Sequence, residues 1–512
     1  MSQLTFGTAG IRAHVGPGPD RMNVGTVTRA TAGVAEWLRT HRSALSPDGV
    51  FRIAVGFDAR YGSHTFARAT AETFVGAGFD VTLNAEPAPT PVLAWLVRSR
   101  NFDAGVQITA SHNPAEDNGY KLYLAGGAQI VSPVDREIEQ CIDAQPADPA
   151  HIPRSEAKNL DMSVVSGYVT AISSLVATGE QRVLAPRRKL KILYTPLHGV
   201  GGNAMEWALR LNGFGNVHCV PSQRWPDPTF PTVSFPNPEE PGAADALLAE
   251  AREVGADLLI ALDPDADRCM LGIHDGDYQM LRGDETGPLL AKYVLGRLVA
   301  SGIKPVVATT VVSSQLLGRM ARAEGWDYVE TLTGFKHLAR AADHRPGELA
   351  FAYEEAIGTA PTPWLVADKD GIATALIAAA WAAELSERGR SLADELADIE
   401  ETYGVFRTAQ VSVRTGSRAE VEKLIAQCAE QPPEALGDVP MTAGPLTDST
   451  GNTGAGVRLT GSTDAVAVRV IARASGTETK AKFYVEVSGS DRAEVEQVLN
   501  RVIADVNELT YH

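Results

Sequence analysis

Three apolar strand stretches of this sequence each lead into a loop of polar side chains. Residues 106–108 lead to Ser111, residues 257–262 lead to Asp263, and residues 349–353 lead to Glu354. Helical patterns separate these strands, and this alternation is typical of layered α/β units. Ligands in such folds bind beyond the carboxyl ends of the strands. The pattern therefore predicts an α/β protein whose chemistry lies in these three loops.

The chain has 512 residues, too many for one hydrophobic core. Its first three segments read as loose copies of one α/β unit, and residues 145–153 read as a linker. The last segment has two clear strands and a closing helix, which predicts a smaller α+β domain. We therefore expect four domains, with limits at residues 1–155, 156–283, 284–404 and 405–512.

The charge of the chain narrows the class of partner. The formal net charge is −17, which argues against nucleic acid or an anionic membrane as a partner. Any anionic substrate must then be held by locally placed cations. No basic region followed by an apolar stretch opens the chain, and no apolar run reaches membrane-spanning length. The four cysteines lie far apart without a CxxC spacing, so we expect a cytoplasmic protein.

The loop at Ser111 combines a hydroxyl, an imidazole and an amide at the end of a strand. Pro114 pushes Asn113 out of the helical region, so the chain must turn there. A nucleophilic Ser111 is one interpretation, and a polar turn that happens to hold a serine is the other. His112 could touch a phosphate or merely fill the loop. Lys121 could be a general acid or base, although a surface lysine is the simpler interpretation.

The loop at Asp263 carries carboxylates at alternate positions. Asp263, Asp265 and Asp267 can converge in a tight turn that Pro264 stiffens, and three such ligands suit Mg²⁺. A solvated acidic turn is the alternative. A calcium EF-hand is rejected, because its glycine and glutamate positions hold Arg268 and His274.

Three further stretches offer groups for an anionic or hydroxylated ligand. Residues 473–480 supply cations, hydroxyls and a flexible glycine that can surround a phosphate, or they form a polar hairpin turn. Residues 6–12 place two glycines beside Arg12. Glu354 and Glu355 can accept hydrogen bonds from sugar hydroxyls, or they are acids favoured at a helix N-terminus.

Taken together, four motifs resemble the α-D-phosphohexomutase superfamily over essentially the whole chain. They are residues 109–114, 263–268, 354–358 and 473–480, in that order and spacing. Residues 6–12, 230–240 and 354–358 look closest to the branch that contains phosphopentomutases and related phosphoglucomutase-like proteins. The resemblance implies three similar α/β domains and a smaller C-terminal βαβ-type domain around a central cleft.

The resemblance also implies roles for individual residues. Ser111 would be the phosphoserine, and Asp263, Asp265 and Asp267 would bind one Mg²⁺ per subunit together with an oxygen of the Ser111 phosphate. Arg12, Lys121, His112 and Arg268 would lie at the reacting centre, with Lys121 as the proton shuttle. The sugar and its own phosphate would be bound by Thr333, Gly334, Phe335, Glu354, Glu355, Arg473, Ser475, Gly476, Thr477 and Lys480.

The implied reaction moves a phosphoryl group between the 1- and 6-positions of a sugar phosphate by way of a sugar bisphosphate. The expected partner is this small sugar phosphate, and the chain is expected to be a monomer or homodimer. Hexose-specific relatives commonly have a serine where this chain has Ala356, so we expect relaxed selectivity among glucose and mannose phosphates. Pentose phosphates are the rival. Two further alternatives are an aspartyl phosphotransferase that uses Asp263, and a non-catalytic sugar-phosphate sensor.

Overall fold

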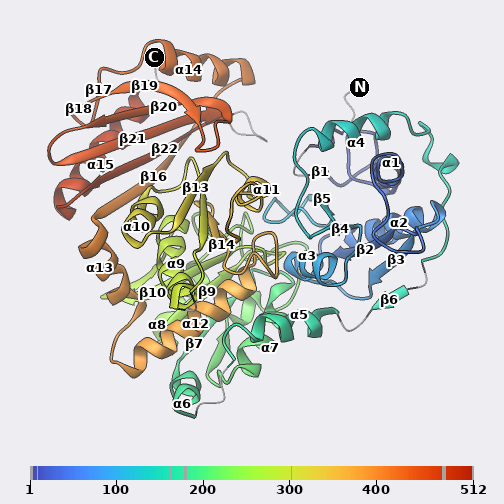
Figure 1. Ribbon diagram of the computed structural model, residues 1–512, viewed down its shortest axis with the longest axis horizontal. Coiled ribbons are helices and arrows are strands. Elements are labelled where there is room, and N and C mark those ends of the chain that lie inside the picture. Colours follow the sequence, from blue (N-terminus) through green and yellow to red (C-terminus); the bar gives the residue numbers. More distant parts are fainter. Residues whose placement is uncertain are drawn as a thin grey trace. The chain divides into compact units, whose positions relative to one another are not determined.

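The computed structural model describes residues 4–7, 10–157, 159–161, 164–177, 181–300, 302–474 and 480–509. The chain divides into two compact units. The first comprises Met1–Thr286 with Ala356–Leu392, and the second comprises Gly287–Glu355 with Ala393–His512 (Figure 1). The predicted substrate-binding residues Ser475, Gly476 and Thr477 lie outside the described residues.

The first sheet of unit one has six strands in the order β1-β5-β4-β2-β3-β6. Strands β4, β2, β3 and β6 run parallel, while β5 and β1 are antiparallel to their neighbours. The strands are β1 (Ile11–His14), β2 (Arg52–Phe57), β3 (Asp80–Asn84), β4 (Ala104–Ile108), β5 (Asp117–Leu124) and β6 (Asn159–Asp161). The helices are α1 (Val24–His41), α2 (Ser63–Gly76), α3 (Thr90–Ser99), α4 (Val134–Asp143) and η1 (Pro149–His151).

Successive side chains along the strands of this sheet point to opposite faces, and different helices cover the two faces. Ile53, Val55 and Val106 pack with residues of α1, α2 and α4 in one core. The residues that alternate with these face α3 on the other side of the sheet. Gly105 allows its strand and α3 to approach each other closely. A Cβ at Gly105 would lie 2.3 Å from Val97 Cγ2 of α3, so a larger residue would push that helix away.

The second sheet of unit one has the order β11-β10-β9-β7-β8, with β9, β7 and β8 parallel. The strands are β7 (Ile192–Thr195), β8 (Val217–Cys219), β9 (Leu258–Leu262), β10 (Cys269–Asp275) and β11 (Asp277–Met280). The helices are α5 (Val164–Ser173), α6 (Gln181–Lys189), α7 (Gly201–Leu211), η2 (Pro221–Gln223) and α8 (Asp245–Val254). Residues 225–241, rich in proline, contain neither helix nor strand.

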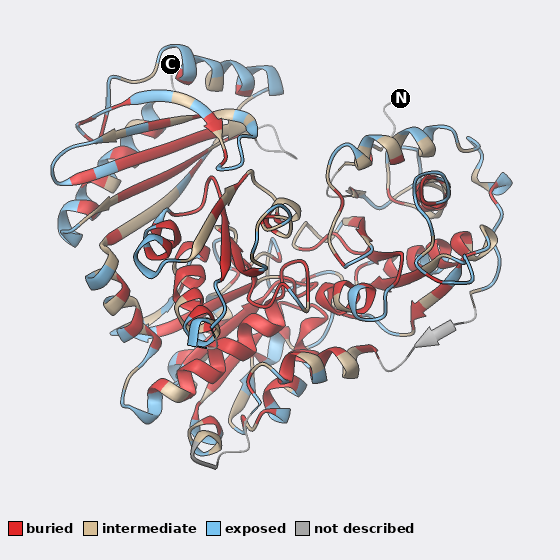
Figure 2. Ribbon diagram, viewed as in Figure 1, coloured by how far each residue is buried: buried red, intermediate tan, exposed pale blue. Residues whose placement is uncertain are grey.

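Helix α12 (Gly371–Glu387) is the most completely buried helix of unit one. It follows strand β15 (Gly358–Ala360) and packs against α6 and α7. Its sequence is apolar at most positions, and Figure 2 shows the helix buried over most of its length. The side chain of Asp370 caps it by accepting a hydrogen bond from the Ala373 amide at 2.9 Å.

Unit two contains a parallel sheet and an antiparallel sheet. The parallel strands are β12 (Val306–Thr310), β13 (Asp327–Thr331) and β14 (Leu349–Glu354). The helices of this part of the chain are α9 (Gly283–Ala300), α10 (Leu316–Glu324), α11 (Phe335–Leu338) and α13 (Leu392–Tyr403).

The antiparallel sheet has the order β16-β22-β21-β20-β19. Its strands are β16 (Val405–Arg414), β19 (Thr442–Thr447), β20 (Thr453–Ser462), β21 (Val466–Ala474) and β22 (Lys480–Gly489). Helices α14 (Arg418–Glu430) and α15 (Arg492–Glu508) pack on this sheet, beside the short pair β17 (Ala435–Leu436) and β18 (Val439–Pro440).

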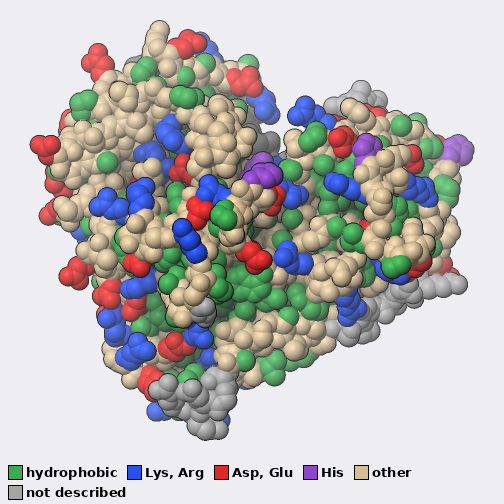
Figure 3. All heavy atoms as spheres, viewed as in Figure 1, with side chains coloured by type: hydrophobic (Ala, Val, Ile, Leu, Met, Phe, Trp, Pro, Cys, Tyr) green, Lys and Arg blue, Asp and Glu red, His purple; other side chains and the backbone are tan. Residues whose placement is uncertain are grey.

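Three α/β sheets and a β-rich C-terminal region match the predicted fold class. Acidic and basic side chains are interspersed on the face shown in Figure 3. Within the described parts of the chain, none of the helices has the length and apolar character needed to cross a membrane.

Candidate active site

Ser111 lies in a buried, strained turn that follows β4. Its φ is 53°, in the left-handed region that non-glycine residues adopt at a cost. The Thr109 hydroxyl accepts a hydrogen bond from the Ser111 amide at 2.9 Å, which fixes the turn locally. The Ser111 hydroxyl in turn donates to Asp263 Oδ2 at 2.8 Å. The predicted nucleophile and the predicted metal loop therefore meet directly.

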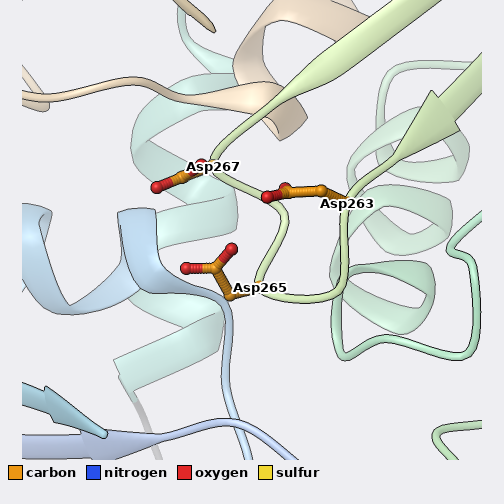
Figure 4. Close-up of side chains that lie close together, drawn as sticks. All are labelled: Asp263, Asp265 and Asp267. Carbon is orange, nitrogen blue, oxygen red and sulfur yellow. The ribbon is translucent and has the colours of Figure 1, made fainter. Parts of the chain in front are cut away.

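The three aspartates lie on one turn between β9 and β10, and all three are fully buried (Figure 4). One carboxylate oxygen from each lies within 4.8 Å of the other two. Ala266, at the middle of the turn, has a φ of 56°. Both loops therefore contain a residue in left-handed backbone, at Ser111 and at Ala266.

Two lysines partly neutralise the aspartates. Lys121 on β5 places its Nζ 2.6 Å from Asp265 Oδ2 and 2.9 Å from Asp267 Oδ2. Lys369 Nζ lies 3.3 Å from Asp267 Oδ2. Burial alone would lower the pKa of Lys121, but Asp265 and Asp267 outweigh burial and raise that pKa above its ordinary value. Lys121 is therefore an ammonium at neutral pH and is equipped to give up a proton rather than to take one.

The pKa values of the three aspartates diverge because their neighbours differ. Burial, together with Asp265 and Asp267, raises the pKa of Asp263 well above its usual value. Burial also opposes ionisation of Asp265 and Asp267, but Lys121 holds the pKa of each below its ordinary range. Asp263 therefore resists ionisation beside the other two carboxylates, and a further cation would favour its ionised form.

The donor set fits a divalent cation. Asp265 Oδ1 and Asp267 Oδ1 are buried and have no hydrogen-bond partner among the described residues. Buried carboxylate oxygens without partners are costly, and hard oxygen ligands from carboxylates are those that Mg²⁺ and similar ions take. These residues could therefore hold a metal ion.

Arg12, His112 and Arg268 surround the same centre. Arg12 donates to Asn113 Oδ1 at 3.5 Å, which keeps its guanidinium beside the Ser111 loop. His112 Nδ1 lies 4.0 Å from Asp263 Oδ2. Burial, with Arg268 and Arg12 nearby, lowers the pKa of His112 well below its usual value, so the imidazole is neutral at pH 7. Arg268 Nη1 donates to the carbonyl of Ala356 at 3.1 Å.

The predicted sugar-binding residues lie in unit two. Arg473 donates to the hydroxyl of Thr333, and its guanidinium lies 5.7 Å from the ring centre of Tyr484. Glu355 accepts hydrogen bonds from Thr310 at 3.0 Å and from Ser313 at 3.3 Å. The remaining described members of the set are Gly334, with a φ of 110°, Phe335 at the start of α11, Glu354 at the end of β14, and Lys480 at the start of β22.

Comparison with known proteins decides the family. Models of the phosphoglucomutase/phosphomannomutase α/β/α domains I, II and III match residues 3–148, 166–276 and 282–403 in chain order. The chain belongs to the phosphoglucomutase/phosphomannomutase family. The predicted superfamily and its fold class, with three such domains and a β-rich C-terminal domain, are confirmed.

Named relatives of this phosphoglucomutase/phosphomannomutase chain act on different sugars. A Haemophilus influenzae protein named "probable phosphomannomutase" is 36% identical over 93% of this chain and 95% of its own length. Human phosphopentomutase is 33% identical over 99% of this chain and 89% of its own length. The open form of parafusin, a phosphoglucomutase from Paramecium, shares the fold, with a TM-score of 0.77 at 17% identity over 100% of this chain and 96% of that one.

Three residues in or near these sites were not predicted from the sequence: Lys369, Tyr484 and Arg60. Lys369 begins a Lys-Asp-Gly turn that only the fold brings to Asp267. A Cβ at Gly371 would lie 2.5 Å from the carbonyl oxygen of Arg268, so this glycine lets the turn approach the aspartate loop. Tyr484 sits mid-strand on β22, and Arg60 follows β2 without a recognisable motif. A polar residue shortly after a strand was the signal available for Arg60.

Proposed function

We propose that the protein is a phosphosugar mutase that interconverts the 1-phosphate and 6-phosphate of a hexose through a phosphoserine at Ser111 and a sugar bisphosphate. The hydrogen bond from Ser111 Oγ to Asp263, inside a buried group of three carboxylates, carries the proposal. Phosphoryl transfer depends mainly on positioning and on neutralising charge, and this arrangement provides both.

The proposed reaction consists of two transfers. In the first, the bond between phosphorus and Ser111 Oγ breaks as the phosphorus bonds to the oxygen of a sugar hydroxyl, and the proton of that hydroxyl passes to water. The Lys121 ammonium supports Ser111 Oγ as a leaving group by giving it a proton. In the second, the bond between the other phosphorus and its sugar oxygen breaks as that phosphorus bonds to Ser111 Oγ. The Ser111 proton returns to Lys121, and the released sugar oxygen takes a proton from water.

The other site residues would hold the reacting groups in place. Asp263, Asp265 and Asp267 would hold Mg²⁺, which supplies positive charge to the phosphoryl oxygens when bound. Arg12, Arg268 and His112 would line the reacting phosphate. The sugar and its distal phosphate would be bound by Thr333, Gly334, Phe335, Glu354, Glu355, Arg473, Ser475, Gly476, Thr477 and Lys480.

The proposal keeps the four predicted domain limits, at residues 1–155, 156–283, 284–404 and 405–512. It also places the protein in the cytoplasm as a monomer or homodimer. Support for a reducing compartment comes from the four cysteines, all of which are free: Cys141, Cys219, Cys269 and Cys428.

The test is the intact mass of the protein after incubation with a hexose bisphosphate. We expect wild type to gain one phosphoryl group that phosphatase removes, and Ser111→Ala to gain none and to lose nearly all turnover. Ser173→Ala, a matched change at a buried serine outside the site, should behave as wild type. Labelling that survives in Ser111→Ala and disappears in Asp263→Asn would establish the aspartyl mechanism instead.

Phosphopentomutase activity is the second candidate, because human phosphopentomutase matches 99% of this chain. The methyl group of Ala356 cannot hydrogen-bond a ring hydroxyl, which supports relaxed selectivity. Values of kcat/KM for the 1-phosphates of glucose, mannose, ribose and deoxyribose decide the ranking. We expect the hexoses to lead; a pentose favoured more than about tenfold, or about 1.4 kcal/mol, would reverse it.

A further inference from the structure

The Arg60 guanidinium donates hydrogen bonds to several backbone carbonyls of the Ser111 loop. Its Nη2 donates to the carbonyls of Ser111 and Asn113, both at 2.6 Å. Its Nη1 donates to the carbonyls of Pro114 at 2.7 Å and Asp117 at 3.2 Å. A single side chain on the loop after β2 therefore bonds four carbonyl groups between Ser111 and the first residue of β5.

Asp58 contacts the edge of the Arg60 guanidinium, and Phe230 covers one of its faces. Arg60 Nε lies 3.4 Å from Asp58 Oδ2, and Asp58 Oδ1 accepts hydrogen bonds from the Arg60 amide at 3.0 Å and from the Ser63 hydroxyl at 2.5 Å. The ring of Phe230 covers one face of the guanidinium, with its centre 4.9 Å from Arg60 Cζ. Arg60 is 4% exposed, so water competes little for these bonds.

Four carbonyl oxygens that converge on one point repel one another unless a cation lies between them. The turn also contains Ser111 in left-handed backbone, so local preferences do not maintain it. A planar guanidinium with five donors can bond several acceptors at once, whereas a lysine ammonium is a compact charge with three donors. The loop conformation therefore depends on an arginine at this position and not on positive charge alone.

We propose that Arg60 is a positioning residue that holds the Ser111 loop in the conformation that directs Ser111 Oγ at Asp263. Arg60 acts through the backbone of the loop. The proposal rests on the proposed function only for its effect on turnover, because its effect on the loop can be measured separately.

Arg60→Lys is the variant of choice, and Arg187→Lys is its matched control. Arg187 is also a buried arginine of unit one, 2% exposed. It donates to the carbonyls of Asn212 at 3.1 Å and Val176 at 2.7 Å, and it stacks on Phe214 with 5.5 Å between Cζ and the ring centre. Arg187→Lys therefore loses bonds of the same kind, to two carbonyl groups instead of four, without touching the Ser111 loop.

Hydrogen exchange and steady-state kinetics are measured on both variants of the full chain. We expect Arg60→Lys to speed amide exchange in a peptide covering residues 109–121 at least about tenfold, and Arg187→Lys to leave that peptide unchanged. We expect kcat to fall about 100-fold in Arg60→Lys, because small misplacements of a reacting group have effects of this size. KM should stay within about threefold of wild type, since ground-state binding is not removed.

The outcomes separate the two proposals. If wild type turns over no sugar phosphate, the proposed function fails, while faster exchange in Arg60→Lys still supports the positioning role. Unchanged exchange in the loop, or a loss of kcat equal in the two lysine variants, would overturn the positioning role. If Arg60→Lys does not fold, Phe230→Leu replaces it, with at least about threefold faster loop exchange expected from loss of the stacking contact and wild-type exchange contradicting the proposal.

Discussion

At the scale of single residues, the Oδ1 atoms of Asp265 and Asp267, which are buried and accept no hydrogen bond from the described residues, are the sharpest sign of a metal ion. We predict that Mg²⁺ stabilises wild type against unfolding, by about 2.7 kcal/mol at a free concentration 100 times its Kd. Asp267→Asn removes one ligand charge and should abolish most of this increment together with activity. Thermal unfolding with and without Mg²⁺ measures it.

Asp103→Asn is the control for this prediction. Asp103 is buried like the three aspartates, but it accepts hydrogen bonds from the amides of Leu45 and Arg52 instead of facing other carboxylates. Asp103→Asn should lower the free energy of unfolding but keep the stabilisation that Mg²⁺ provides. Full activity of wild type in excess chelator after exhaustive dialysis would contradict a metal requirement.

At the scale of elements, what the sequence predicted well was local. Ser111 and Asp263 each follow an apolar strand closely, and a short loop after a strand stays at the edge of its sheet. The convergence of Asp263, Asp265 and Asp267 follows from their alternate spacing in a single turn. These features need only the immediate chain, so the sequence was sufficient to place both loops directly after their strands.

What the sequence could not predict depends on chain segments far apart. Arg60 reaches a loop more than fifty residues later, and Lys369 meets Asp267 across about a hundred residues. Tyr484 lies beside Arg473 because β21 and β22 pair. Local propensity and spacing carry no information on such encounters, which are set by sheet pairing and helix packing.

Helix α12 supplies a prediction for the pH dependence of stability. Burial raises the pKa of its capping residue, Asp370, to about 6 from an ordinary value of 3.8. Asp370 Oδ1 accepts from the Tyr168 hydroxyl at 2.5 Å and from the Ala373 amide, while Oδ2 has no hydrogen-bond partner among the described residues. The folded state therefore keeps a proton that the unfolded chain has already released between pH 4 and 6.

The sign follows from this difference in bound protons. The contribution of Asp370 to the free energy of unfolding is fully present below about pH 4 and is lost as pH rises through 6, by up to about 3 kcal/mol. Asp370→Asn keeps an oxygen for the cap and removes the titration. Its stability relative to wild type, from urea unfolding, should rise across that window and then level off.

Tyr168→Phe provides the complementary variant. The Tyr168 hydroxyl bonds the ionised form of Asp370 and lowers its pKa, so its removal should extend the loss of stability to higher pH. Unfolding free energies of Asp370→Asn and wild type that run parallel from pH 4 to 7 would contradict the titration of Asp370.

At the scale of the whole molecule, a buried ionic group and a small apolar cluster join the two parts of unit two. Arg469 of β21 donates to the carbonyls of Val311, at 2.9 Å, and of Ser313 beyond β12, and its Nη2 lies 3.3 Å from Glu486 Oε1. Beside it, an apolar cluster combines residues that directly follow β12 with residues of the antiparallel sheet: Val311, Val312, Leu446, Ile471 and Tyr484. The parallel and antiparallel sheets of unit two should therefore unfold together.

The last prediction tests that coupling with two arginines. Arg469→Ala leaves Glu486 and two carbonyls buried without their partner, so it should cost about 3–5 kcal/mol and separate the unfolding of the two sheets. Arg458 lies on the neighbouring strand β20 with its side chain 26% exposed, and it pairs with Glu330 at 3.2 Å. Because Arg458 is more exposed than Arg469, which is 6% exposed, Arg458→Ala should cost less than Arg469→Ala and leave one transition. Urea unfolding, followed by exchange of peptides from β12 and β21, measures both effects. Equal costs for the two variants, or a single shared transition in Arg469→Ala, would show that the apolar cluster alone couples the sheets.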